Sequence, residues 1–192
     1  MQVNINKLMI LPIYAYGQPV LKKVATDIDS SYPNLTTLLE NMWQTMYNAH
    51  GVGLAAPQIG LDIRLFIVDT IQTMDEDKAS DGIKTVFINA RILQESGEEW
   101  AYEEGCLSIP FVRGDVMRQP NITIEYYDEN FTKHTKSFDG LNARVIQHEY
   151  DHIEGVLFVE KLKPLKKKLI QKKLENIKKG NIQAEYKIKF VN

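Results

Sequence analysis

The sequence has very little cysteine and no long apolar run. Its 192 residues include one cysteine, Cys106, so no disulfide bond can form within the chain. A reducing compartment is therefore expected, and the cytoplasm is the simplest location. No stretch approaches the roughly 18 consecutive apolar residues of a transmembrane helix. The apolar segment from Leu8 to Tyr16 is interrupted by Pro12 and lacks a basic n-region, so we expect no signal peptide and no membrane partner.

A strong net charge is also missing. Lysine and arginine together number 23 and aspartate and glutamate 25, so the formal net charge of −2 provides no bulk attraction to nucleic acid or anionic lipid. The composition, 44% hydrophobic and 25% charged, is that of an ordinary globular protein. We expect a single domain over residues 1–192, because this length suits one domain with a sizeable core.

The most informative segment of the chain is QHEYDH, at residues 147–152. It holds the pattern H-E-x-x-H, in which His148 and His152 are four residues apart. On a helix this spacing places both imidazoles on one face, where they can bind the same metal ion. Glu149 follows the first histidine, where its carboxylate can handle a proton of metal-activated water. The pattern also occurs by chance, so the rest of the sequence must decide between a metal site and two ordinary histidines.

The residues around this motif predict a buried helix of roughly 15 residues, a usual length in globular proteins. Leu141 and Val145 precede the histidines at helical spacing, so the expected ligands share their face with apolar side chains. Asp139 is the expected N-cap, and Gly155 is the expected residue just beyond the C-terminus.

Apolar periodicity predicts several strands before this helix and an amphipathic helix on either side of it. Strands are expected at residues 63–69, 86–93, 112–117, 122–127 and 131–138, with a last short one at 185–191. The amphipathic helices are expected at residues 34–50 and 164–179. Because the strands cluster and do not alternate with helices, we predict the α+β class, with antiparallel strands packed around the central metal-binding helix.

A catalytic metal site usually has three protein ligands and one open position, and the helix supplies only two. Cys106, in the segment EGCLSIP that follows Glu103, offers a thiolate that suits zinc or ferrous iron. Glu175 is the alternative, because proteases with H-E-x-x-H commonly take a ligand from a later helix, and it would make the protein a zinc-type endopeptidase. Spacing alone does not choose between them. His50 and His134 are not expected to be ligands.

A structural metal site in a binding module is the non-enzymatic alternative. Such a site should be closed by a fourth protein ligand. The sequence has no second cysteine and no further histidine in a suitable place. An open, catalytic site is therefore favoured.

Three segments together resemble the signature motifs of the peptide deformylase family. They are GVGLAAPQIG at residues 51–60, EGCLSIP at 104–110 and QHEYDH at 147–152, in the same order as in that family. Their joint occurrence is far more specific than H-E-x-x-H alone, and the resemblance covers about residues 8–162. It implies a metal-dependent hydrolase that removes the formyl group from N-formylmethionyl nascent polypeptides and releases formate.

Matched position by position, the resemblance implies roles for individual residues. The metal ligands would be Cys106, His148 and His152, which would bind one divalent ion per chain. Fe²⁺ is the ion associated with this family, and Zn²⁺, Ni²⁺ or Co²⁺ can replace it. Glu149 would be the general acid and base. Gln58 and the backbone N–H of Leu107 would form the oxyanion hole.

The proposed substrate needs an apolar pocket for its methionine side chain and a partner for its peptide backbone. The resemblance implies that Gly53 and its neighbours hold that backbone. Val52, Leu141 and Val145 are apolar and close to the motifs, so we expect them to line the methionine pocket.

The expected C-terminal helix is strongly basic. Residues 161–179 hold nine lysines and one acid, Glu175, a local charge of +8. An apolar stripe is expected to dock this helix on the body, formed by Leu162, Leu165, Leu169, Ile170, Leu174 and Ile177. Most of the lysines must then face solvent, either as a solubilising surface or as a contact with an acidic or nucleic-acid partner. The ribosome is the natural candidate for this partner, and the family resemblance points the same way.

Overall fold

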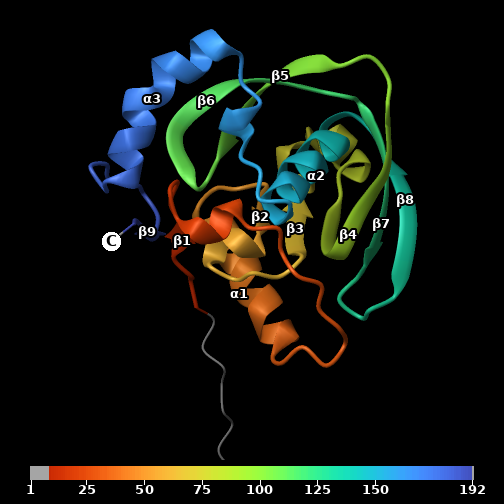
Figure 1. Cartoon of the computed structure of the whole chain (residues 1–192). Coiled ribbons are helices and arrows are strands. Elements are labelled where there is room, and N and C mark those ends of the chain that lie inside the picture. The colour runs from red at the N-terminus through yellow and green to blue at the C-terminus, as the bar shows by residue number, and fades with distance from the viewer. Residues whose placement is uncertain (1–8, 192) are drawn as a thin grey trace, which may run out of the picture.

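The structure is a computed structural model that describes residues 9–191, apart from the side chains of residues 76–78. Leu8, where the N-terminal apolar segment starts, lies outside the described residues. In the described part the strands form three sheets (Figure 1). The largest is antiparallel, with five strands in the order β2 (Gly53–Ala55), β3 (Leu65–Asp69), β4 (Lys84–Ser96), β7 (Asn121–Tyr127) and β8 (Lys133–Phe138).

The two smaller sheets have two strands each. One is an antiparallel hairpin of β5 (Trp100–Cys106) and β6 (Ile109–Arg118). The other pairs β1 (Ile13–Tyr14) with β9 (Ile188–Lys189) in parallel, and thus brings the two ends of the described chain together.

The longer helices are α1 (Leu35–Asn48), α2 (Gly140–Ile153) and α3 (Pro164–Lys178), each where the sequence predicts one. Helices combined with largely antiparallel sheets confirm the predicted α+β class. None of the helices within residues 9–191 is long and apolar enough to cross a lipid bilayer.

The sequence does not predict strands β2 and β5. Glu103, Glu104 and Gly105 have low β-propensity, and their extended conformation depends on pairing with β6 across the hairpin. The strand expected from residue 131 begins only at Lys133, because Phe131 belongs to the preceding turn and has a φ of +56°. In both cases pairing and turn geometry override the local pattern.

Strand β3 is buried on both faces and separates α1 from α2. Successive side chains of a strand point to opposite sides of its sheet. Ile67 accordingly packs in one cluster with Met42 and Met46 of α1, whereas Phe66 packs in a second cluster with Ile146 of α2. This burial places α2 against β2 and β3, with its polar functional residues close to the glycine-rich segment of β2.

Both expected boundaries of α2 coincide with the structure. Asp139 is the N-cap residue, although its side chain makes no capping hydrogen bond. Gly155 follows the last turn with a φ of +70°, and a Cβ at this position would lie 2.8 Å from the backbone carbon of Lys22. Glycine therefore allows the chain to leave the helix beside this neighbouring segment.

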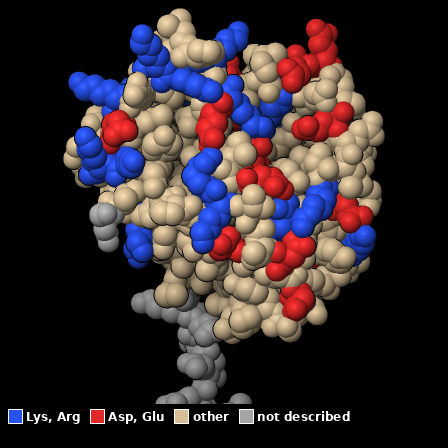
Figure 2. Space-filling model, viewed as in Figure 1, with Lys and Arg blue, Asp and Glu red and all other residues tan. Residues whose placement is uncertain are grey.

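The prediction for the apolar stripe of α3 is partly wrong. Leu162, Ile170 and Ile177 are buried, but Leu165 and Leu169 are 71% and 69% exposed. Helix α3 packs mainly on β6, at the outer edge of the molecule, so only a narrow face of it is covered (Figure 1). Lysine side chains gather over this helix in the space-filling view (Figure 2).

Candidate active site

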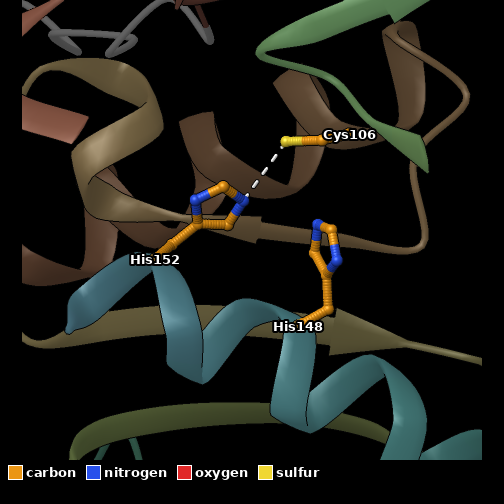
Figure 3. Close-up of side chains that lie close together, drawn as sticks. All are labelled: Cys106, His148 and His152. Carbon is orange, nitrogen blue, oxygen red and sulfur yellow. Dashed lines mark hydrogen bonds between the residues drawn. The ribbon is translucent and has the colours of Figure 1, made fainter. Parts of the chain in front are cut away.

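Cys106, His148 and His152 come together at the end of β5 and on one face of α2 (Figure 3). Their potential ligand atoms all lie within 4.8 Å of one another. The Cys106 Sγ is 3.3 Å from the His152 Nε2. A thiolate and two imidazoles are donors that suit zinc and ferrous iron, and three such ligands leave a coordination position open. This cluster could therefore hold a metal ion.

The structure favours Cys106 over Glu175 as the third member of this cluster. Among the residues described, the cluster is the only group of three or more His, Cys, Asp or Glu side chains with ligand atoms close enough to share an ion. Glu175 lies on α3 and is exposed. His134 is bound instead to the carboxylate of Asp128, 2.8 Å away. The endopeptidase alternative thus loses its expected ligand.

Glu104 is a functional candidate that the sequence reasoning missed. It is only 5% exposed, and its Oε2 lies 2.9 Å from Nδ1 of His148. Arg118 donates two hydrogen bonds to the same carboxylate, at 2.7 and 2.9 Å, and Arg144 donates a third at 3.0 Å. The position of Glu104 just before Gly105 and Cys106 in the second motif was the available signal.

This network orients His148. Burial alone would raise the pKa of Glu104, but the hydrogen bonds from Arg118 and His148 outweigh it and hold the pKa well below its usual range. An ionised Glu104 can only accept, so the Nδ1 of His148 must donate. In the neutral imidazole, the Nε2 of His148 then carries the lone pair that a metal requires.

Glu149 is 4% exposed and lies against β2. A Cβ added to Gly53 would be only 2.5 Å from the Glu149 Oε1, so glycine permits this close approach. The Oε2 of Glu149 is buried without a hydrogen-bond partner among the described residues. Burial raises the pKa of Glu149 to about 7, which is suitable for a group that must take up and release a proton near neutral pH.

The side-chain amide of Gln58 is held in one orientation. Its Oε1 accepts a hydrogen bond of 2.8 Å from the backbone N–H of Ala55. Its Nε2 consequently points toward the cysteine loop, 3.4 Å from the Cys106 Sγ and 3.3 Å from the Ser108 Oγ. Gln58 can therefore present an N–H donor beside the cluster of Cys106, His148 and His152. Its contact with Ser108 is one that the sequence does not reveal.

A cleft of about 770 Å³ collects most of the predicted site residues. It is lined by Val52, Gly53, Gln58, Cys106, Leu107, Leu141, Val145, His148 and Glu149. His152 is 1% exposed and lies beneath this surface. Residues from other parts of the chain complete the walls, among them Phe111, Lys173 and Tyr186.

A thiolate, an imidazole and a buried carboxylate line one cleft, and a second helix-borne imidazole lies beneath it. These groups suit a metal-dependent hydrolase. The sequence model described as polypeptide deformylase matches residues 10–168 of the chain. The chain therefore belongs to the polypeptide deformylase family, and it is an enzyme of the hydrolase class.

Individual relatives agree with this assignment. The peptide deformylase of Christiangramia forsetii is 60% identical over 191 residues, which cover 96% of this chain and 97% of that protein. The peptide deformylase of Flavobacterium johnsoniae is 59% identical over 189 residues, covering 95% and 96%. The crystal structure of a peptide deformylase from Legionella pneumophila superposes with a TM-score of 0.78 at 36% identity, covering 90% of this chain and 98% of that one.

Proposed function

We propose that this enzyme hydrolyses the N-terminal formyl group of N-formylmethionyl polypeptides and releases formate. The observation that carries the proposal is the meeting of the Cys106–His148–His152 cluster with Glu149 at one cleft of a deformylase-family fold, with His152 beneath its surface. Nascent chains would be its substrates, so we infer that it acts in the cytoplasm. We also infer that residues 1–192 work as one catalytic domain, with antiparallel strands arranged around α2.

Cys106, His148 and His152 would hold one divalent metal ion. When bound, such an ion lowers the pKa of water and supplies a nucleophile near neutral pH. The thiolate of Cys106 would partly neutralise its charge, and this soft donor is compatible with Fe²⁺, which we propose as the native ion. The same ligand set would also accept Zn²⁺, Ni²⁺ or Co²⁺.

Other residues of the cleft would transfer the proton and stabilise the negative charge that develops on the substrate. Glu149 would accept the proton of the attacking water and deliver it to the departing amine, which leaves as the free N-terminus. The Nε2 of Gln58 and the backbone N–H of Leu107 would donate hydrogen bonds to the formyl oxygen as it becomes anionic. Loss of one such donor typically costs about 3 kcal/mol of transition-state stabilisation.

Apolar residues beside the cluster would recognise the substrate. Val52, Leu141 and Val145 line the cleft, and we propose that they surround the methionine side chain. Gly53 lies at the start of β2, where its backbone is close to Glu149 and can pair with the peptide backbone.

Formate release is the measurement that separates deformylation from peptide cleavage. Formyl-Met-Ala-Ser should yield formate and intact Met-Ala-Ser. A zinc-type endopeptidase would yield shorter peptides instead, and the exposed position of Glu175 gives no support to that activity.

We further propose that α3 contacts the ribosome. Its lysines at positions 166–168, 172 and 173 are exposed, and they flank the exposed Leu165 and Leu169. Clustered, exposed lysines suit a polyanionic partner such as ribosomal RNA.

A further inference from the structure

The C-terminal segment, residues 181–191, returns to the active-site cleft. It follows α3 and lies beyond residue 168, where the match to the family model ends. Ile188 and Lys189 pair with β1, and the preceding residues Glu185 and Tyr186 line the cleft. A segment outside the three sequence motifs thus contributes a wall of the site.

Tyr186 connects this segment to the cysteine loop. Its hydroxyl donates a hydrogen bond of 2.6 Å to the backbone carbonyl oxygen of Leu107, which follows Cys106 directly. The ring of Tyr186 packs against the cluster that includes Met42 and Met46. Burial, and secondarily the electrostatic effect of the nearby Cys106, raises the pKa of Tyr186, so the phenol remains a neutral donor at physiological pH.

The rest of the loop is also fixed, but at other atoms. The backbone N–H of Tyr16 donates to the carbonyl oxygen of Ser108 at 2.8 Å, and Gln58 contacts the Ser108 hydroxyl. Because β1 and β9 are paired, the same small sheet carries Tyr16 just after β1 and Tyr186 just before β9. Both ends of the described chain therefore hold the loop between Cys106 and Ile109.

We propose that Tyr186 is a positioning residue for the oxyanion hole. Its hydrogen bond fixes the peptide plane that joins Leu107 to Ser108. Fixing this plane restricts the φ and ψ of Leu107, which set the direction of the Leu107 N–H in the preceding peptide plane. The inference rests on the proposed role of that N–H. A preorganised donor acts mainly on the transition state, so the effect should appear in kcat and not in KM.

Tyr186→Phe tests this role because it keeps the ring and removes only the hydroxyl. We expect kcat for formyl-Met-Ala-Ser to fall by about fivefold, the factor that corresponds to one neutral hydrogen bond, with KM changed by less than about twofold. Amide hydrogen exchange at Leu107 and Ser108 should accelerate in the metal-free variant, whereas the melting temperature should change little. The matched control is Tyr14→Phe, which removes a hydroxyl that contacts Lys189 away from the cleft.

Two results distinguish this inference from the proposed function. A wild-type enzyme that releases no formate contradicts the proposed function itself. An active wild type whose Tyr186→Phe variant matches Tyr14→Phe in kcat and in amide exchange overturns only the positioning role. Faster exchange at these two amides together with a selective loss of kcat supports it.

Discussion

The Nδ1 of His148 lies 2.9 Å from the Oε2 of Glu104, so one strand of the β5–β6 hairpin orients a candidate metal ligand on α2. The same carboxylate accepts hydrogen bonds from Arg118 and Arg144, both nearly fully buried. Glu104 therefore has two roles: it compensates the positive charges of two buried guanidinium groups, and it sets the orientation of the His148 imidazole.

Glu104→Gln should weaken metal binding by about 10- to 100-fold, because partners of ligand imidazoles commonly contribute this much. Competition with a coloured chelator measures the affinity. Glu103→Gln is the matched control, since the carboxylate of Glu103 is exposed and lies 3.8 Å from the exposed Arg113. Equal affinities for the two variants would show that Glu104 has no part in orienting His148.

Alanine at any of the three proposed ligands should remove the bound metal. The substitutions are Cys106→Ala, His148→Ala and His152→Ala, each of which leaves two protein ligands for a divalent ion. Glu175→Ala should retain the metal, because that carboxylate is exposed on α3. Metal analysis after purification without oxygen checks both statements. Retention by the Cys106 variant with loss from the Glu175 variant would reverse the ligand assignment.

The free energy of unfolding of the metal-free enzyme should depend on pH because of the raised pKa of Glu149. Its pKa is raised from 4.5 to about 7, so between these values the folded state keeps a proton that the unfolded state has lost. The stabilising contribution of this proton is complete below pH 4.5 and disappears as the pH rises through about 7.

Comparison with Glu149→Gln isolates this effect, because the amide does not titrate. The free energy of unfolding of the wild type, relative to the variant, should decline by up to about 3 kcal/mol across that range. Denaturant titrations with excess chelator at several pH values measure it. A difference that is constant with pH would contradict an elevated pKa for Glu149.

Glutamine at three lysines of α3 that do not line the cleft should weaken ribosome binding and leave hydrolysis of a free formyl tripeptide unchanged. The substituted residues are Lys167, Lys168 and Lys172, whereas Lys166 and Lys173 are kept because they line the cleft. Co-sedimentation at increasing salt measures the binding, which should decrease steeply because each neutralised phosphate releases counterions.

The control for this experiment replaces an equal number of exposed lysines elsewhere. Suitable positions are Lys84, Lys133 and Lys136. If both sets of substitutions affect co-sedimentation equally, α3 is only a solvated surface.

Sequence spacing predicts the parts of the site that are local. His148 and His152 are four residues apart on one helix, so their common direction follows from helical geometry alone. Cys106 is different, because only the turn between β5 and β6 and the packing of that hairpin bring it to α2. Its place beside the histidines could be inferred from the family resemblance but not from spacing.

The parts that the sequence does not predict depend on pairing between distant segments. Glu104 on β5 contacts Arg118 on β6 and Arg144 on α2. The periodicity of the sequence does not predict contacts between such separate elements. For Leu165 and Leu169, helical periodicity identifies an apolar face but does not say how much of it a neighbour covers. The actual contact of α3 with β6 is narrow, which explains the error.

Formate release by the metal-loaded wild type and by Glu149→Gln tests the central claim most directly. With formyl-Met-Ala-Ser, the wild type should release one formate for each new amine, at about one metal ion per chain. Glu149→Gln should keep the metal and lose about 10²-fold or more in kcat, because an amide cannot accept the proton. Absence of formate from the metal-loaded wild type, or near-normal turnover by Glu149→Gln, would contradict the account.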